Sequence, residues 1–291
     1  MDTMLSFSDN NLATKYLSMK DLKEMCPAAF AKDKTNPNTS ERYSYVNTED
    51  VINDLAERGW YPVQAKQNRT KKNSSGVRSF HMIAFQNETV TIRTKNPDGT
   101  DGPVDTYPRI ILTTSHDGYN SFKFMVGLFR LVCSNGLVVS DGEIASITIR
   151  HINYTKAELL KVIDKTLDFV PVAAEKMTTM SHTEVTKEQK REIATEVVKI
   201  RKGVDDEQKF EIDEATIMDI LNPVREEDKS DDLWTVYNLC QEKLIKGGFS
   251  AKGKNDKTRK QRSITSIKKD IDYNQRLWEV VMRYMPATAA A

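Results

Sequence analysis

The chain has 291 residues and a mass of 33.2 kDa, enough to bury a sizeable core in one large domain or two. Charged residues make up 29% of it, slightly above the roughly 25% of an average globular chain, so part of the chain is expected to be loop or linker. It has no apolar run near the roughly 18 residues that cross a bilayer, no secretion-signal pattern and only three scattered cysteines. These features exclude a membrane-spanning protein and a disulfide scaffold and predict a cytoplasmic protein without a membrane partner.

The net charge of +1 conceals two stretches of opposite sign. Residues 154–242 contain 13 Lys/Arg and 21 Asp/Glu, whereas residues 243–276 contain 11 Lys/Arg and 3 Asp/Glu. A second basic island, with no acidic residue in it, runs from Lys66 to Arg78. Clustered positive charge near a loop is typical of phosphate binding. The alternative is that the basic stretch packs against the acidic helices of the same chain and contributes only solubility.

Residues 1–41 are predicted to form an N-terminal arm and loop. They carry little periodic pattern, and residues 31–41 are rich in Asn, Thr, Ser, Lys and Pro. A short helix is expected over residues 48–58. Asn47 supplies its N-cap, apolar residues follow at helical spacing, and Gly59 comes after its last turn.

Residues 42–153 are predicted to form an antiparallel sheet domain that begins with this helix. Short runs rich in Val, Ile, Tyr, Phe and Thr alternate with clusters of Asn, Gly, Asp and Ser, as in strands joined by hairpins. The expected strands are residues 60–67, 78–86, 88–95, 108–115, 119–126, 137–140 and 146–152. Residues 128–133 fit either a strand or a helical turn. The basic island falls on the first hairpin loop.

Residues 154–248 are predicted to form an acidic helical region. Helices are expected after a capping box at Thr155, over residues 187–202 and 213–221, and after an N-cap at Ser230. Pro171 is expected to stop the first of these helices, because a proline removes a backbone hydrogen bond. Gly203 and Gly247 are expected to end two of the others.

Residues 249–291 are predicted to form a basic arm followed by a terminal helix over residues 263–285. Residues 249–262 have almost nothing to bury, which indicates a mobile loop or an arm. The chain as a whole is therefore expected to be an α+β protein, with a leading helix, an antiparallel β-sheet and a helical C-terminal half.

Catalytic, cofactor and metal motifs are absent from the sequence, which favours a binding protein without a cofactor or a metal over an enzyme. His81 and His151 could lie near His116 and Asp117 on one side of the sheet, and such a cluster could support metal-assisted hydrolysis. The alternative is that these histidines form hydrogen bonds at turns and strand ends. Cys133 lies in an apolar run, where a free cysteine is usually buried.

The sequence supports a nucleic-acid-binding site better than it supports a catalytic or metal site. Single-stranded polynucleotides bind to basic grooves with aromatic faces for base stacking, and predicted strands beside the basic island carry Trp60, Tyr61, Phe80 and Phe85. Most of these aromatic residues are expected in the core. The residues predicted to bind nucleic acid are Lys66, Arg69, Lys71, Lys72, Arg78, Lys252, Lys254, Lys257, Arg259, Lys260 and Arg262.

Residues 113–139, TTSHDGYNSFKFMVGLFRLVCSNGLVV, contain two turn motifs, Ser-His-Asp-Gly and Cys-Ser-Asn-Gly. This stretch resembles a phage- and plasmid-borne family of unknown function, number nine-three-two among such domains, in which a histidine follows the two motifs. Residues 43–67 and 233–248 are also similar to the family's first helix and strand and to its C-terminal helices. Thr114 departs from the family's pattern, where an asparagine is expected.

The resemblance implies an origin in a mobile element and assigns no activity. By motif position, the candidate catalytic residues are Ser115, His116, Asp117, Arg130, Asn135 and His151. Arg130 should either pair with a carboxylate such as Asp117 or face an anion. The alternative is that the motifs are two tight turns that brace a β-hairpin.

Three hypotheses about function stay open. The first is a phage or plasmid accessory protein that binds single- or double-stranded DNA non-specifically, in recombination, replication or strand annealing. The second is a metal-dependent or nucleotide-directed enzyme, including one that blunts host defence, built on His116, Asp117 and His151. The third is a protein-binding module or virion component that forms a homo-oligomer through its acidic and basic stretches.

Overall fold

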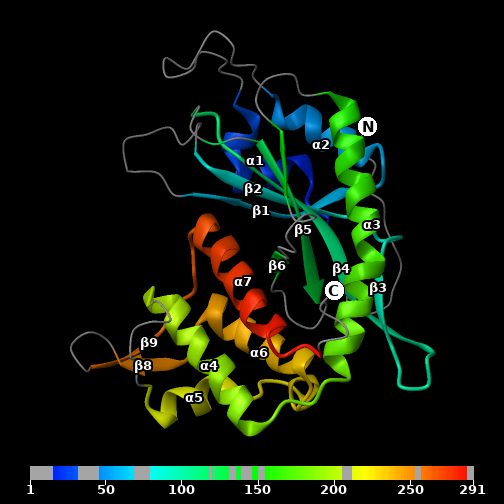
Figure 1. Ribbon diagram of the computed structural model, residues 1–291. Helices are drawn as coiled ribbons and strands as arrows, with labels where there is room; N and C mark the ends of the chain where they lie inside the picture. The colour runs from blue at the N-terminus through cyan, green and yellow to red at the C-terminus, as the bar shows by residue number, and fades with distance from the viewer. Residues whose placement is uncertain are drawn as a thin grey trace.

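The computed structural model is an antiparallel sheet with helices packed on both of its faces (Figure 1). It describes residues 16–31, 46–68, 79–117, 120, 122–130, 136–138, 146–149, 155–204, 212–252 and 257–286, with the backbone only at residues 103–105, 129–130, 136–138 and 146–149. The predicted α+β class, with a leading helix, an antiparallel sheet and a helical C-terminal half, is confirmed. In these parts of the chain, no helix combines the length and the apolar character that crossing a bilayer requires.

The sheet contains seven strands in the described part of the chain: β1 (Tyr61–Gln67), β2 (His81–Gln86), β3 (Ile92–Lys95), β4 (Asp101–Thr114), β5 (Phe122–Arg130), β6 (Gly136–Val138) and β7 (Ser146–Ile149). Their order is β1-β2-β4-β5-β6, with β3 paired to β4 and β7 paired to β5, and every pair is antiparallel. The apolar run that fitted either a strand or a helical turn continues β5 as a strand as far as Arg130.

One face of the sheet packs against α1 (Met19–Met25), the 3-10 helix η1 (Pro27–Phe30) and α2 (Thr48–Ala56). Asn47 caps α2 as predicted. Residues 16–31, which were expected in a loose arm, instead form α1 and η1 and bury Leu22 and Cys26 completely. A helix of seven residues is too short to show a clear periodic pattern in the sequence.

Helix α3 (Lys156–Ser181) crosses the same face of the sheet and does not stop at Pro171. The capping box expected at Thr155 is present only in part: Thr155 is the N-cap and accepts a hydrogen bond from the Glu158 backbone. Pro171 and Leu167 both lie on the exposed side of the helix. The Leu167 carbonyl that loses its partner can therefore be hydrated, which makes the proline tolerable.

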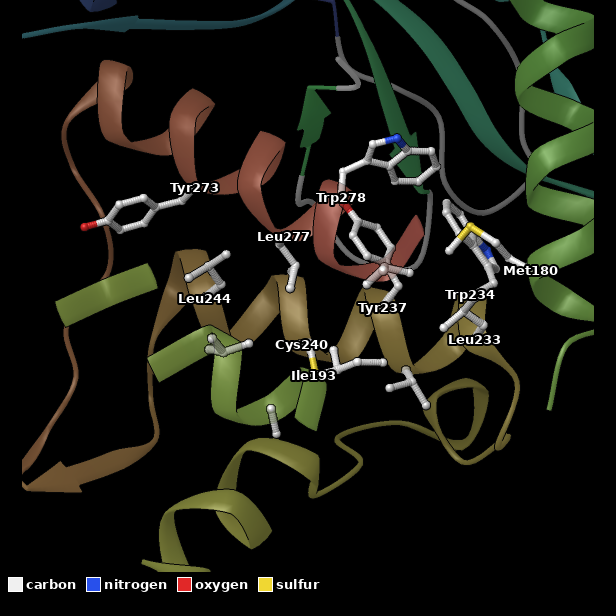
Figure 2. Close-up of a cluster of buried hydrophobic side chains, with 14 of the residues drawn as sticks. Met180, Ile193, Leu233, Trp234, Tyr237, Cys240, Leu244, Tyr273, Leu277 and Trp278 are labelled. Atoms are coloured by element: carbon white, nitrogen blue, oxygen red, sulfur yellow. The ribbon is translucent and has the colours of Figure 1, made fainter. Parts of the chain in front are cut away.

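The other helices form a second core below the sheet (Figures 1 and 2). They are α4 (Lys187–Lys202), α5 (Glu214–Leu221), the 3-10 helix η2 (Glu226–Asp228), α6 (Leu233–Lys246) and α7 (Ile267–Met282). The predicted capping box of α4 and its left-handed terminator Gly203 are confirmed. The N-cap of α6 is Asp232, not Ser230, because the Asp232 carboxylate accepts the hydrogen bond of the Thr235 backbone.

Helix α7 joins the two cores. At its first turn, Ile267 packs with Met82 and Ile111 on the face of the sheet opposite α2 and α3. Further along, Trp278 packs edge-on against Tyr237 of α6, with ring centres 5.5 Å apart (Figure 2). Helix α3 does the same, because its first half packs on the sheet and its second half packs in the helical core, so α3 and α7 both connect the sheet to the helical half.

A short hairpin precedes α7, where a mobile loop or an arm was expected. Its strands are β8 (Ser250–Lys252) and β9 (Thr258–Lys260), and they project from the outer edge of the helices beside α4 and α5 (Figure 1). The segment was expected to have almost nothing to bury, but Phe249 and Ala251 are both buried. These two side chains fix the base of the hairpin in the helical core.

Candidate nucleic-acid interface and the Ser-His-Asp-Gly turn

Four of the six candidate catalytic residues lie in the described part of the chain, three directly after β4 and one at the end of β5. Ser115, His116 and Asp117 follow β4 directly, and Arg130 is the last residue of β5, paired through its backbone with Thr106. Asn135 and His151 lie outside the described residues. Because Thr106 is far along β4 from Thr114, Arg130 lies towards the other end of the strand from Asp117, and the expected pair of Arg130 with Asp117 is wrong. Ser115, His116 and Asp117 lie together, and the positions of Asn135 and His151 stay untested.

His116 lies beside a second buried histidine, His81. The ring centres are 5.5 Å apart, and the two residues are exposed by 3% and 0%. His81 is the first residue of β2 and is paired with Thr114 of β4, which sets its ring on the side of the sheet that faces α2. On that side, the Nε2 atom of His116 lies 3.4 Å from the hydroxyl of Thr48 in the first turn of α2.

The hydrogen bonds of His81 define its tautomer. Its Nδ1 lies 3.0 Å from the Ser79 carbonyl, which can only accept a hydrogen bond. Nδ1 therefore carries the proton, and Nε2 is unprotonated and can only accept. Nε2 has no hydrogen-bond partner in the described part of the chain. Burial lowers the pKa of His81 from 6.5 to about 4, because a charged imidazole would lose its hydration there. The ring is therefore neutral at physiological pH.

The buried Ser115 and the half-buried Asp117 belong to a polar network at the same turn. The Ser115 hydroxyl donates to the Asp117 carboxylate, and the Asn120 amide donates to the Ser115 oxygen at 2.8 Å. The Asn120 oxygen in turn accepts a hydrogen bond of 2.8 Å from Lys268 in the first turn of α7. Sequence reasoning missed Asn120 and Lys268, because 148 residues separate them and no local pattern joins them.

The chemistry available at this turn is that of hydrogen bonding. Among the residues that the structure describes, no group of three or more His, Cys, Asp and Glu side chains is placed to hold a metal ion. The predicted cluster of His116, Asp117 and His151 stays untested, because its third member lies outside the described residues. Burial raises the pKa of Cys26 and of Cys240 to about 12, which keeps both thiols protonated and unreactive.

The first basic island is represented in the described residues by Lys66. Its ammonium group lies 3.3 Å from the carboxylate of Asp270 on α7. Burial raises the pKa of Asp270, and the neighbouring Lys66 opposes that effect. This lysine is therefore neutralised within the chain. Arg69, Lys71, Lys72 and Arg78 lie outside the described residues, as does Lys254 of the second basic segment.

The second basic segment differs from Lys66 in that its cations are exposed. We call the exposed side chains Lys252, Lys257, Arg259, Lys260 and Arg262 the basic hairpin. In the described part of the chain none of the five forms an ion pair. Arg259, Lys260 and Arg262 border an open hollow of about 780 Å³, together with Arg201 of α4 and Gln261.

The Arg201 side chain is held by hydrogen bonds to backbone carbonyls at the edge of this hollow. Its guanidinium donates to the carbonyls of Leu244 at 2.8 Å and Arg262 at 3.0 Å, and it lies 5.6 Å from the centre of the Phe249 ring. Burial lowers the pKa of Arg201 below its usual value. The positive charge available to a ligand therefore belongs to the basic hairpin.

The four aromatic residues considered for base stacking are divided between the core and the surface. Trp60 and Phe85 are buried in the sheet core, as expected for most of the set. Tyr61 is half-buried against Tyr16, with ring centres 5.1 Å apart, and the half-buried Phe80 lies beneath the ammonium group of Lys268. Tyr61 lies on β1 and Phe80 directly before β2, whereas the basic hairpin projects from the helical half (Figure 1).

The fold and the site define an α+β protein. It has a hydrogen-bonded polar turn at one end of its sheet and an exposed basic hairpin on its helical half. The chain belongs to the family described as Domain of unknown function (DUF932), whose model matches residues 38–278. It is 29% identical to UPF0380 protein YafZ of Escherichia coli (strain K12) over 262 residues, which cover 90% of this chain and 89% of that protein. It is 28% identical to UPF0380 protein YfjQ of the same organism, with the same coverage. No solved structure matches.

Proposed function

We propose that the protein binds nucleic acid non-specifically through the basic hairpin. The observation that carries this proposal is the exposure of Lys252, Lys257, Arg259, Lys260 and Arg262 without an ion pair in the described part of the chain. Cations that already have a carboxylate partner, such as Lys66, must give it up to contact a phosphate. Lys252 is attracted by the carboxylate of Asp213, whose pKa it helps to lower. Lys257, Arg259, Lys260 and Arg262 have no such carboxylate among the described residues, so each can release a counterion from the nucleic acid.

The shape of the hairpin also supports binding to a long anion. Three of its cations line one open hollow, which gives a phosphate chain several contacts at once. The side chains make no fixed pattern of donors and acceptors for base edges, so the contacts suit phosphates and carry no sequence preference. Such binding fits an accessory protein of a phage or plasmid in recombination, replication or strand annealing.

The test is fluorescence anisotropy with a labelled oligonucleotide of arbitrary sequence. With about five phosphate contacts, affinity should fall by roughly 10²-fold to 10³-fold between about 50 and 200 mM salt. The variant Arg259→Ala/Lys260→Ala/Arg262→Ala should flatten the plot of log affinity against log salt by about 2.7.

The matched control removes three exposed lysines from another surface. Lys161→Ala/Lys165→Ala/Lys187→Ala changes the net charge by the same amount, and these lysines lie on α3 and at the start of α4. It should leave the salt dependence almost unchanged. Equal losses in the two triple variants, or no binding by the wild-type protein at micromolar concentration, would refute the proposal.

A further inference from the structure

Two cations of the basic hairpin share its outer face, the face turned away from the helical core. In the β8–β9 ladder, Lys252 is opposite Thr258, and Ser250 is opposite Lys260. Opposed residues of a ribbon point to the same side, and so do residues two apart in one strand. Lys252 and Lys260 therefore lie together with the hydroxyls of Ser250 and Thr258, which can also donate to phosphates.

The other face of the hairpin turns towards the helical core. Ala251 and its opposed residue Arg259 lie on this face, and Ala251 is buried in the core. The Gln261 backbone donates to the Phe249 carbonyl at 2.8 Å, so the pairing continues beyond the strands and the next residue, Arg262, returns to the outer face. Arg262 therefore adds a third cation to the outer face.

Carboxylates of α5 flank the β8 strand of the hairpin. Asp219 accepts a hydrogen bond of 2.8 Å from the Ser250 backbone, and Asp213, the N-cap of α5, attracts Lys252. In the described part of the chain, no carboxylate forms a hydrogen bond or an ion pair with a residue of β9. Because carboxylates repel phosphates, a phosphate chain should follow β9 and not β8.

The positive charge of β9 continues through a linker into α7. Residues 257–269 contain six Lys and Arg and no Asp or Glu. All six are exposed, and within the described part of the chain none of them forms an ion pair. The linker passes along the outer edge of the helical half from β9 to the start of α7 (Figure 1). We call Lys260, Arg262, Lys268 and Lys269 the β9–α7 track.

The linker between the two halves of the track is fixed on the helical half. The Ile264 backbone donates to the Ile245 carbonyl at the end of α6 at 2.8 Å, and the Ile264 side chain packs against the helical core. Lys268 follows Arg262 by six residues, so their Cα atoms are at most about 22 Å apart. Because this backbone is already held in place, a bound strand does not have to order it.

The two lysines in the first turn of α7 are open to an anion in different ways. Lys269 follows the buried Ile267 by two residues, which is about 200° around the helix, so it faces away from the sheet. The Lys268 ammonium group lies 2.8 Å from the Asn120 amide oxygen and over the Phe80 ring. Both of these partners are neutral, so a phosphate does not have to displace a carboxylate from Lys268.

Carboxylates mark the far end of the track. Beyond Lys268, Asp117 lies in the Ser-His-Asp-Gly turn and Asp272 lies in the second turn of α7. The carboxylate between them in the chain fold, Asp270, already pairs with Lys66 at 3.3 Å. These negative charges repel a phosphate chain. The contacts of a bound strand should therefore stop at the first turn of α7.

We infer that a nucleic-acid strand bound by the basic hairpin continues along the β9–α7 track and ends beside the Ser-His-Asp-Gly turn. The inference rests on the proposed function and gives the path of its ligand. A single line of cations contacts one phosphate backbone, so the ligand needs only one strand, either free or as part of a duplex. The lysines of α7 add two phosphate contacts, so the fall of affinity with salt becomes steeper than the basic hairpin alone would give.

Acetylation of exposed lysines tests this path in the wild-type protein. The full chain is treated with a lysine-reactive acetylating reagent, with and without a saturating DNA oligonucleotide, and mass spectrometry measures the reaction at each site. Lys260, Lys268 and Lys269 should react several-fold more slowly in the complex, whereas Lys161 and Lys165 of α3 should react at the same rate. Protection of Lys260 without protection of Lys268 and Lys269 overturns the inference.

The salt dependence of binding gives a second test. Lys268→Ala/Lys269→Ala removes two contacts and should flatten the plot of log affinity against log salt by about 1.8 for a DNA duplex or about 1.4 for a single strand. Lys161→Ala/Lys165→Ala changes the net charge equally and should keep the slope. Lys269→Ala alone should flatten the slope for a duplex by about 0.9, and urea unfolding checks that each variant is folded. An unchanged slope in both α7 variants overturns the inference.

The outcomes separate the two claims. If the triple hairpin variant flattens the salt dependence and the α7 variants do not, the proposed function stands and the inferred path fails. If the wild-type protein binds no oligonucleotide at micromolar concentration, or if only the α7 variants flatten the slope, both fail. Flattening in the hairpin variant and in the α7 variants supports both.

Discussion

The Nζ atom of Lys268 lies 2.8 Å from the Oδ1 atom of Asn120, and the same ammonium group stands 5.0 Å from the centre of the Phe80 ring. These contacts tie the first turn of α7 to the turn that contains Ser115 and Asp117. Because β9 runs into α7 over only a few residues, the basic hairpin and the Ser-His-Asp-Gly turn are joined through one helix end.

Replacement of Lys268 should weaken this junction. Lys268→Ala removes one hydrogen bond to a neutral acceptor and a cation–π contact of about 0.5–1 kcal/mol at an exposed site, so the free energy of unfolding should fall by about 1 kcal/mol. Urea unfolding measures the change. The control is Lys269→Ala, an exposed lysine of the same turn, whose loss should cost less than about 0.5 kcal/mol. Equal effects at the two positions would show that the contact to Asn120 contributes nothing.

The buried His81 should make stability depend on pH. Its pKa is lowered from 6.5 to about 4 on folding, so the unfolded chain binds the proton more tightly than the folded protein. The unfolding free energy should be constant above about pH 6.5, fall as the pH drops from 6.5 to about 4, and lose on the order of 3 kcal/mol across that window.

The variant His81→Asn isolates this contribution. Asparagine can keep the hydrogen bond to the Ser79 carbonyl but cannot be protonated. The difference in unfolding free energy between wild type and variant should therefore shrink as the pH falls from 6.5 to about 4. His182→Asn, which changes an exposed histidine, should keep the wild-type curve. A difference that stays constant over this window would contradict the assignment of a buried neutral ring.

The elements that could be predicted from sequence depend on local chemistry. The capping box of Thr186 and Gln189, the left-handed Gly203 and the Asn47 cap each involve residues within one turn of each other. Such signals need no knowledge of the rest of the chain. The strand regions were predictable for the same reason, because alternation and turn residues are visible within a few positions.

The features that could not be predicted depend on tertiary packing. Pro171 is tolerated inside α3 because the Leu167 carbonyl, which receives no N–H from a proline, lies on the exposed side of the helix. Which side of a helix is exposed is a property of the fold. Phe249 and Ala251 looked isolated in a charged segment, yet the helical core buries both. The contact of Lys268 with the Ser-His-Asp-Gly turn joins distant parts of the chain. Sequence predicted the turn of the candidate site but not its partners.

A half-buried ion pair should contribute more to stability than an exposed one. Arg225 donates to both carboxylate oxygens of Glu242, at 2.8 and 3.0 Å, and lowers the pKa of Glu242 to about 2. Arg225→Met leaves this carboxylate, whose side chain is 13% exposed, with only Lys246, and it also removes the contact of Arg225 to the buried Asp228 at 3.1 Å. We therefore expect a loss of about 2 kcal/mol in urea unfolding at neutral pH. The part of the loss that comes from Glu242 should fade as the pH drops from 4.5 towards 2, because Glu242 then becomes protonated.

The matched control for Arg225 is Arg191, which pairs with Glu214 at the surface. The two side chains are 49% and 51% exposed, so water screens their attraction. Arg191→Met should therefore cost less than about 1 kcal/mol. If both arginine variants lose the same stability, burial does not strengthen the Arg225 pair.

The backbone at the base of the hairpin should tolerate no side chain at Gly247. Gly247 has φ of 72° and ψ of −130°, a region open almost only to glycine, and a Cβ atom there would lie 2.5 Å from the Gln261 carbonyl oxygen. Backbone cannot move aside as a flexible side chain does, so Gly247→Ala should cost at least about 3 kcal/mol. At Gly248, φ is 85° but a Cβ atom would meet nothing within 4 Å, so Gly248→Ala should cost only the strain of about 1–2 kcal/mol. Urea unfolding of the two variants measures the difference. Since Gln261 directly precedes Arg262, Gly247→Ala should also weaken binding of the labelled oligonucleotide by the protein that remains folded. A Gly247→Ala variant as stable and as tightly binding as Gly248→Ala would mean that the hairpin base adjusts freely.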